Sequence, residues 1–178
     1  MKNNGISTFR YDKRIVKQIK KGNVDPNIMF NHFVEDAKSV FSYFKTSNSF
    51  SKIYFIGHSQ GSLVAMLASQ EGADGYISLA GAGKSIDEVI TDQIVATAPQ
   101  LEDDTKKVFA IMKTGQITTD YPPALYSVFN EGVQPFMINW MKYNPQEEIK
   151  KLNIPILIIN GTKDLQVKET EAQLLKEA

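Results

Sequence analysis

Short apolar runs that alternate with helical patterns constrain the fold of this chain more than any other feature of its sequence. Four such runs are Gly5–Tyr11, Lys52–Gly57, Gly75–Gly81 and Ile154–Gly161. The last is almost continuously apolar, which is typical of a strand buried on both faces of a sheet. Because strands and helices alternate, the sequence predicts an α/β fold with a mostly parallel sheet and helices on both of its faces.

Local signals predict where the helices begin and end. Asp25 and Pro26 resemble an N-cap and the first helical residue, and an apolar stripe at helical spacing follows them. A second helical pattern, SLVAMLASQEG, stops at Gly72, and Ser85–Glu88 has the form of a capping box. No strand pattern appears in residues 85–148, so we interpret this segment as a helical cap inserted into a single domain that spans residues 1–178.

Composition excludes several classes of function. The 20 Lys and Arg residues balance the 20 Asp and Glu residues, so we do not expect nucleic acid as a partner. The chain has no cysteine and only two histidines, so we expect neither a metal site nor another cofactor. No apolar stretch approaches the roughly 18 residues of a membrane span. We therefore expect no membrane span and a cytoplasmic protein, unless a signal peptide precedes Met1.

The segment FIGHSQGS places Ser59 between two glycines, at the junction of a predicted strand and a predicted helix. Gly57 and Gly61 are expected to let a sharp turn close, which would expose Ser59 at the carboxyl edge of the sheet. The helix that follows would direct its free N–H groups at this edge, so Gln60 is the predicted oxyanion donor. A chance match in an ordinary turn is disfavoured, because the flanking strand and helix are both present. The sequence therefore predicts that Ser59 is a nucleophile.

A serine nucleophile needs a histidine base and an acid that orients the base. Asp164 follows the last apolar run, and loops at the carboxyl ends of parallel strands commonly carry such groups. Its alternative role is that of a turn residue beside Asn160 and Gly161. Neither histidine is well placed as the base. His58 is expected to point toward neighbouring strands, and His32 lies on a helix that covers the sheet.

Four segments together resemble the α/β-hydrolases, and among them the serine esterases, lipases and serine aminopeptidases. The segments, in the order of the family, are RYDKR, GHSQGS, LAGAG and IPILIINGTKDLQV. The resemblance implies a catalytic triad with Ser59 as nucleophile and Asp164 as acid, and it implies that residues 85–148 form the cap. It also implies a histidine after the acid and an upstream glycine-bearing loop with a second oxyanion donor, and both are absent. We therefore expect that the sequence is a fragment cut at both ends.

Three functional hypotheses follow. The first is a serine hydrolase that cleaves small carboxylic esters through an acyl-enzyme on Ser59, without a cofactor. The second is an aminopeptidase or another acyl hydrolase of the same fold. An aminopeptidase would need an acidic cap residue for the substrate amine, and the candidates are Asp87, Asp92, Glu102, Asp103, Asp104 and Glu131. The third is a catalytically incomplete module used for binding. Exposed sheet edges and apolar faces lead us to expect self-association of the chain.

Two further patterns in the cap region bear on ligands. SLAGAGKS, residues 78–85, resembles a phosphate-binding loop but has Ser78 where the pattern requires glycine. We interpret Lys84 as a surface lysine and Ser85 as an N-cap. The cap is rich in aromatic residues, and we expect most of them in a core and some in an apolar pocket that faces Ser59. These residues are Phe109, Tyr121, Tyr126, Phe129, Phe136, Trp140 and Tyr143.

Overall fold

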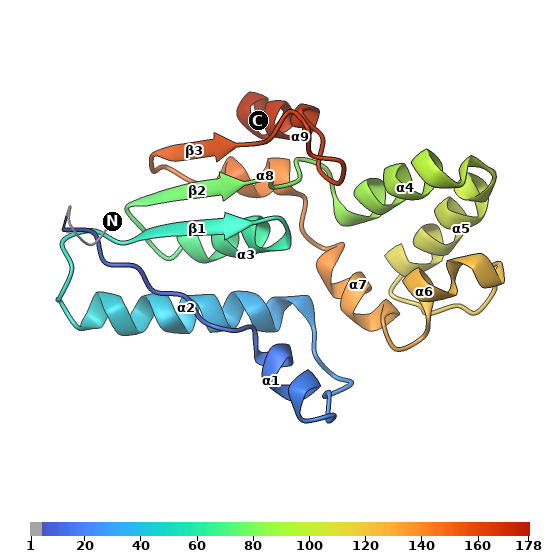
Figure 1. Ribbon diagram of the computed structural model, residues 1–178, viewed down its shortest axis with the longest axis horizontal. Coiled ribbons are helices and arrows are strands. Elements are labelled where there is room, and N and C mark those ends of the chain that lie inside the picture. The colour runs from blue at the N-terminus through green and yellow to red at the C-terminus, as the bar shows by residue number, and fades with distance from the viewer. Residues whose placement is uncertain (1–4) are drawn as a thin grey trace.

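A computed structural model of the chain, which describes residues 5–178, contains a three-stranded parallel sheet with a group of helices beyond its carboxyl edge (Figure 1). The strands are β1 (Tyr54–His58), β2 (Gly75–Leu79) and β3 (Ile156–Ile159). The helices are α1 (Arg14–Lys20), α2 (Phe30–Thr46), α3 (Gln60–Ser69), α4 (Ile86–Thr97), α5 (Glu102–Lys113), α6 (Tyr126–Phe129), α7 (Gln134–Trp140), α8 (Pro145–Ile149) and α9 (Glu169–Glu177), with short 3₁₀ turns η2 (Pro99–Leu101) and η3 (Pro123–Leu125).

The sheet has the strand order β1-β2-β3, and its register aligns the three carboxyl ends. His58 pairs with Leu79, and Leu79 pairs with Ile159, so all three strands end in one row. The loops that follow the strands therefore leave from a single edge of the sheet. Ser59 begins the first of these loops and Ala80 the second.

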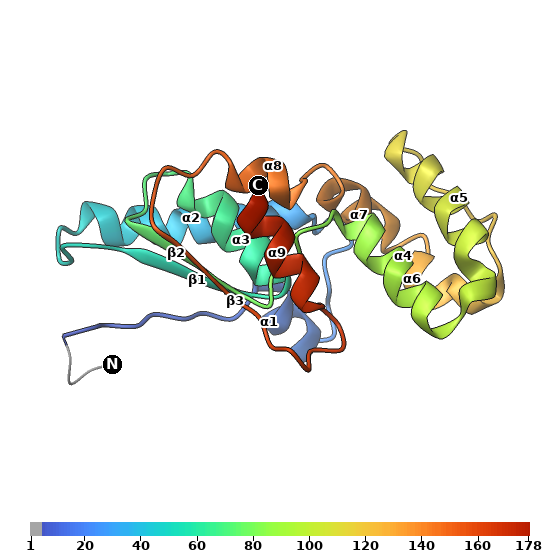
Figure 2. The same ribbon diagram turned by 90° about the horizontal axis from the view of Figure 1, so that it is seen from above.

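Helices α2, α3, α8 and α9 cover one face of the sheet, and together with the strands they form what we call the sheet layer. Figure 2 shows α2, α3 and α8 on the same side of the strands. Helix α3 contacts β1 and β2 directly, and α2 and α8 pack on α3. Because α3 is enclosed in this way, every residue from Ser62 to Ser69 is buried. Its apolar neighbours in the core include Phe30, Phe33, Val34, Ala37, Tyr76, Ile149 and Leu175.

The opposite face of the sheet carries no helix within residues 5–178. Tyr54 and Ile56 of β1 are 50% and 53% exposed, and Leu157 and Ile159 of β3 are 51% and 48% exposed. Exposure alternates along β3, so the expected burial of this strand on both faces is not found in the described residues. The apolar run is instead half-buried, and it leaves a row of large apolar side chains in contact with solvent.

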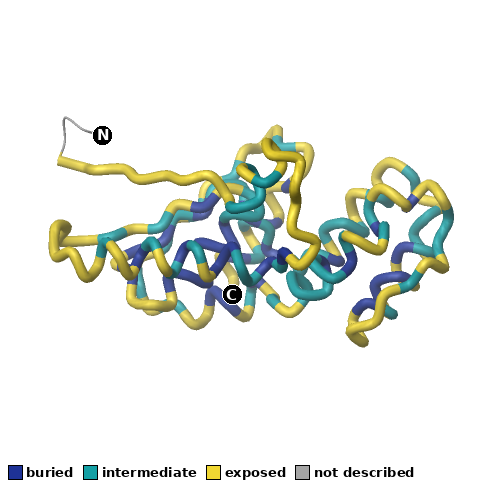
Figure 3. The backbone as a smooth tube through the Cα atoms, turned by 90° about the horizontal axis from the view of Figure 1, so that it is seen from below, coloured by how far each residue is buried: buried dark blue, intermediate teal, exposed yellow. Residues whose placement is uncertain are grey.

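The prediction of a strand at Gly5–Tyr11 is wrong. The segment is extended but pairs with no described strand, and Figure 3 shows that it is exposed. Its aromatic residues pack locally. The ring of Phe9 lies 5.0 Å from that of Phe44 on α2 and 6.2 Å from that of Tyr11. A strand needs a partner for its backbone groups, and the side-chain pattern alone could not provide one.

Helix α2 begins at Phe30, four residues after the predicted start at Pro26. The Oδ1 atom of Asp25 accepts the N–H of Asn27 at 2.9 Å, which forms a turn instead of a helix cap. At the actual start, Nδ1 of His32 accepts the N–H of Met29 at 3.1 Å. His32 therefore stabilises the helix start.

Helices α4 to α7, residues 86–140, form a second apolar core that we call the cap segment. Its buried residues are Val108, Phe109, Met112, Leu125, Phe129 and Met137. The predicted capping box at its start is confirmed, because the Ser85 N–H donates to Oε2 of Glu88 at 3.1 Å. Trp140, at the end of α7, packs against both cores and connects the two layers. No described helix is both long and apolar enough to cross a membrane.

Candidate active site

Ser59 lies at the sharp turn from β1 into α3, with backbone angles φ 52° and ψ −124°. A positive φ is uncommon for a residue other than glycine and costs on the order of 1–3 kcal/mol, so the surrounding structure must enforce it. Two hydrogen bonds do so. The Ser59 N–H donates to the Leu79 carbonyl at 2.9 Å, and the Ser59 carbonyl accepts the Ser62 N–H at 2.8 Å. The turn is thus fixed to the end of β2 on one side and to the first turn of α3 on the other.

The two glycines that flank Ser59 have different roles. A Cβ atom on Gly57 would lie 2.1 Å from the carbonyl oxygen of Gly61 and 2.6 Å from Cα of Ser62. A Cβ atom on Gly61 would have no described atom within 4 Å. The turn therefore requires a glycine before the serine, whereas the expected need for a small side chain after it is not found in the described residues.

A buried cluster of hydroxyl groups, between α3 and β2, lies next to the turn. The Oγ atom of Ser62 lies 2.6 Å from the phenol oxygen of Tyr76 and 2.8 Å from Oγ of Ser78. Tyr76 also donates to the Ser62 carbonyl at 3.0 Å, and burial raises the pKa of this phenol. A Cβ atom on Gly81 would lie 2.1 Å from Oγ of Ser62. The cluster thus connects α3, β2 and the loop after β2.

Gln60 is the first residue of α3, where backbone N–H groups have no partner in the helix. Its side chain accepts a hydrogen bond at 2.5 Å from the ammonium of Lys13. The same ammonium lies 5.3 Å from the centre of the Phe33 ring, and burial lowers its pKa. Lys13 thus fixes the side chain next to the predicted nucleophile. None of the described hydrogen bonds uses the Gln60 N–H.

Asp164 lies in the loop between β3 and α9, and it organises that loop. Its Oδ1 atom accepts the N–H groups of Gln166 at 2.8 Å and Val167 at 3.0 Å. These two hydrogen bonds lower the pKa of the Asp164 carboxyl, and the nearby charge of His58 contributes in the same direction. Asp164 is therefore ionised at neutral pH.

Neither histidine side chain forms a hydrogen bond with Ser59 in the described residues. His32 accepts a hydrogen bond at the start of α2, and His58 projects from the exposed face of β1, near Asp164. The structure therefore brings no histidine base to Ser59 from within the described residues.

A cavity of about 230 Å³ opens beside Ser59, between the sheet layer and the cap segment. The sheet layer contributes Ser59, Gln60 and Leu63, and the loop after Asp164 contributes Gln166 and Val167. The cap side contributes the apolar residues Ile86, Val89 and Trp140. The ring of Trp140 stacks on that of Phe30 at 5.1 Å and 3°, so this wall is held firmly. Asp164 does not line the cavity but shapes the loop that does.

The loop after β2 also borders the cavity, through Ala82 and Lys84. The N–H groups of Gly83 and Lys84 both donate to Oε2 of Glu171, at 2.9 Å each. The Lys84 ammonium pairs with Asp92 at 2.6 Å. A phosphate-binding loop needs such N–H groups free for the ligand, so the hydrogen bonds in this loop disfavour that function.

A larger depression of about 610 Å³ lies at α1, lined by Lys13, Arg14, Lys17, Lys20, Lys21 and several polar residues. Its described lining contains no serine and consists mostly of charged residues, so we do not assign the chemistry to it. No group of three or more described metal-ligating side chains occurs in the structure.

Sequence reasoning predicted roles for Ser59, Gln60 and Asp164, and the structure places Ser59 and Gln60 at the cavity and Asp164 outside its lining. It did not single out Lys13 and Glu171. The aromatic composition suggested a pocket wall, and the structure places Trp140 there. Lys13 and Glu171 are brought to the site by contacts between distant segments, and no local pattern marks them.

The chain was compared with known proteins. No protein-family profile matches it. It is 28% identical over 186 aligned positions to Esterase EstD of Thermotoga maritima, an alignment that covers 97% of this chain and 42% of the esterase. The chain thus spans less than half the length of this relative.

Solved structures of similar fold include a hydrolase from Pseudomonas aeruginosa and an esterase from Exiguobacterium antarcticum. Both have a TM-score of 0.50 and 15% sequence identity. The alignments cover 86% of this chain and 62% of the hydrolase, and 87% of this chain and 64% of the esterase. At this identity the likeness concerns the fold.

Proposed function

The chain has the α/β-hydrolase fold, and from this premise we propose that it cleaves small carboxylic esters through an acyl-enzyme on Ser59. The observation that carries the proposal is the backbone of Ser59, which is held at φ 52° where a strand turns into a helix beside a cavity. Strain of this kind commonly persists at reactive residues, where the surroundings enforce it.

The reaction would proceed by nucleophilic substitution at the ester carbonyl. Oγ of Ser59 attacks the carbonyl carbon and loses its proton to a general base, and the oxyanion accepts the Gln60 N–H. The carbon–oxygen bond to the alcohol then breaks, and the base returns the proton to the leaving alcohol. Water, activated by the same base, attacks the acyl-enzyme and releases the acid and Ser59.

Neither His32 nor His58 is placed to act as the general base of this mechanism. Because the chain spans 42% of the length of the esterase it resembles, we propose that a histidine outside residues 1–178 serves as the base and that Asp164 orients it. The alternative, a catalytically incomplete module, predicts that no added base will activate Ser59.

The lining of the cavity favours an uncharged substrate. None of the described residues that line it is acidic, and the one described cation in the lining, Lys84, is paired with Asp92. Ile86, Val89 and Trp140 offer an apolar wall. An aminopeptidase would need a carboxylate for the substrate amine, but none of the six acidic candidates lines the cavity. Three of them, Asp87, Asp92 and Glu102, pair with Lys113, Lys84 and Lys106. These contacts favour ester cleavage over aminopeptidase activity.

The test is covalent labelling of Ser59 by a fluorophosphonate, followed by intact mass spectrometry, with and without imidazole as a substitute base. We expect labelling that imidazole accelerates, and none in Ser59→Ala. Ser49→Ala, which removes an exposed hydroxyl remote from the turn, should label like the unmodified chain. EDTA should change none of these rates.

Loss of the base costs a serine hydrolase on the order of 10⁶ in turnover, so labelling without imidazole should be slow. Equal labelling of the Ser59→Ala variant would refute the nucleophile. Failure of imidazole to accelerate labelling at Ser59 would favour the incomplete module.

A further inference from the structure

The loop after β2, residues 80–84, forms one wall of the cavity beside Ser59, and we propose that Glu171 is the positioning residue that holds this wall in place. The inference rests on the proposed function, because the position of the wall matters only if a ligand enters this cavity. Glu171 itself does not line the cavity, so its effect would be indirect.

The carboxylate of Glu171 is committed to the loop. Oε2 accepts the N–H groups of Gly83 and Lys84 at 2.9 Å each, and the side chain is only 9% exposed. The Lys84 ammonium lies 4.0 Å from Oε1. A buried charge is costly unless it is hydrogen-bonded, and here two backbone donors and one cation satisfy it.

The loop backbone also lies directly on helix α9. A Cβ atom on Gly83 would lie 2.5 Å from the carbonyl oxygen of Glu171 and 2.7 Å from Cβ of Leu174. From the other side, Nε2 of Gln146 on α8 donates to the Gly83 carbonyl at 3.1 Å. Both polar groups of the Gly83 backbone are therefore bonded to helices of the sheet layer.

This anchor links three parts of the cavity. The loop leads directly into α4, whose first turns contribute Ile86 and Val89 to the apolar wall. Helix α9 follows the loop that contains Asp164, and this loop contributes Gln166 and Val167 to the lining of the cavity. A second link, the hydrogen bond at 3.2 Å from Nε2 of Gln93 to the Gln166 carbonyl, spans the same gap. Glu171 thus fixes the start of the cap segment relative to the acid loop.

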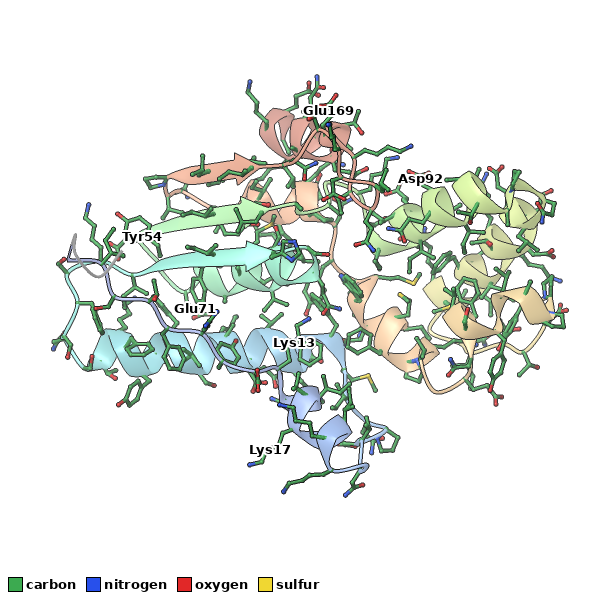
Figure 4. The ribbon with its side chains drawn as sticks, in the orientation of Figure 1. Lys13, Lys17, Tyr54, Glu71, Asp92 and Glu169 are labelled. Atoms are coloured by element: carbon green, nitrogen blue, oxygen red, sulfur yellow. The ribbon has the colours of Figure 1, made fainter. Side chains whose placement is uncertain are left out.

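Removal of the carboxylate would leave two amides without an acceptor and free the loop to move. Glu171→Ala tests this loss, and Glu171→Gln keeps an acceptor oxygen at the same place. Two controls separate position from stability. Glu169→Ala removes a carboxylate of the first turn of the same helix (labelled in Figure 4), and Val34→Ala weakens the core at α2, remote from the loop.

The first measurement is amide hydrogen exchange at Gly83 and Lys84 by NMR. We expect exchange about tenfold faster or more in Glu171→Ala, because one lost hydrogen bond of this kind is worth roughly 1.4 kcal/mol or more. Glu171→Gln, Glu169→Ala and Val34→Ala should stay within about threefold of the unmodified chain after correction for global stability. Unchanged protection in Glu171→Ala, or an equal loss in Val34→Ala, would overturn the proposal.

The second measurement is ligand binding reported by the fluorescence of Trp140, which is the one tryptophan of the chain and lines the cavity. The probe is N-butylbutanamide, an uncleavable amide analogue of a short ester. We expect Glu171→Ala to weaken its binding about fivefold or more, and Glu171→Gln to restore most of the affinity.

The two measurements distinguish the two proposals. If the unmodified chain does not bind the amide, the cavity assigned under the proposed function is wrong, while the exchange data still decide whether Glu171 holds the loop. If the unmodified chain binds the amide and Glu171→Ala binds it equally well, the positioning role is wrong and the proposed function stands.

Discussion

The sheet layer and the cap segment bury their apolar side chains in different ways. In the sheet layer, backbone pairing sets the position of every strand, and one face of the sheet remains open within the described residues. The cap segment has no described strand, and its helices close around a core that includes Val108, Met112 and Phe129, all fully buried. A regular backbone ladder defines the first region, and side-chain packing defines the second.

In the cap segment, buried polar side chains hold the backbone in position, as backbone pairing does in the sheet. Gln134 is fully buried, and its amide bonds to both backbone groups of Thr118, at 2.9 and 2.7 Å, and to the Phe129 carbonyl at 2.5 Å. The comparison shows that the candidate nucleophile lies where the backbone determines position, and the pocket walls lie where individual side chains do.

The largest effect should come from adding one methyl group at the edge of the sheet. Gly57→Ala places Cβ against the backbone of Gly61 and Ser62, which cannot yield without moving α3. We expect the free energy of unfolding to fall by about 3 kcal/mol, as overpacking against backbone commonly costs 1–3 kcal/mol and occasionally more. Urea denaturation followed by circular dichroism would measure this change.

Gly61→Ala is the matched control, because its Cβ meets no described atom. It should leave the stability unchanged or raise it by up to about 1 kcal/mol, since alanine favours the helix. Equal destabilisation by both substitutions would mean that the close backbone contacts at Gly57 do not account for the cost.

The same contrast explains what could be predicted from the sequence. The places of β1, β2 and β3 in the sequence, the turn at Ser59 and the capping box at Ser85 have local causes, and each was predicted close to its position. The turn at Ser59 could be predicted because a strand, a glycine and a helix meet there, and these signals are adjacent in the chain. The predicted roles of Ser59, Gln60 and Asp164 remain predictions.

What was missed depends on contacts between distant segments. Gly5–Tyr11 has a strand-like pattern but no adjacent strand, and α2 begins later because Asp25 caps a turn instead of the helix. The hydrogen bonds from Lys13 to Gln60 and from Gly83 to Glu171 join residues that share no local pattern. Periodicity identifies an apolar run such as β3, but it does not show whether one face or both will be covered.

An intermediate effect is expected from pH in the cap segment. Burial raises the pKa of the Asp87 carboxyl. Hydrogen bonds from Lys113 and Ser85 and the charge of Lys113 lower it, and together they outweigh burial, so the net shift of the pKa is downward. A lowered pKa stabilises the folded state above the unfolded value of about 3.9, and this contribution is lost as pH falls through the folded value. Asp87→Asn should therefore be less stable than the unmodified chain at pH 7, by about 1–2 kcal/mol, and the difference should shrink below about pH 3.5.

Urea denaturation at pH 7 and below about pH 3.5 measures the difference in the free energy of unfolding between Asp87→Asn and the unmodified chain. Asp120→Asn is the control in the same segment, because the pair of Asp120 with Lys107 is exposed on both sides and should contribute little. A pH-independent deficit in Asp87→Asn would assign its effect to packing instead of charge.

The smallest effect on stability should come from the open face of the sheet, although its effect on association should be clear. Ile56 and Leu157 lie in the same row across the sheet, on either side of Ile77, and each is about half exposed. Threonine has the β-branched shape that strands favour and removes apolar surface, so Ile56→Thr combined with Leu157→Thr should cost only about 1 kcal/mol in total, because each side chain is already half exposed. A contiguous apolar face of this kind promotes contact between copies, so the unmodified chain should self-associate at micromolar concentrations and the double variant should do so much less.

Sedimentation velocity measures the self-association of both proteins. Tyr43→Thr is the control, because Tyr43 is 71% exposed on α2 and lies outside the sheet. If the double variant associates as strongly as the unmodified chain while Tyr43→Thr does not, the adhesive surface is on α2, and the open face of the sheet is not what distinguishes the sheet layer from the closed cap segment.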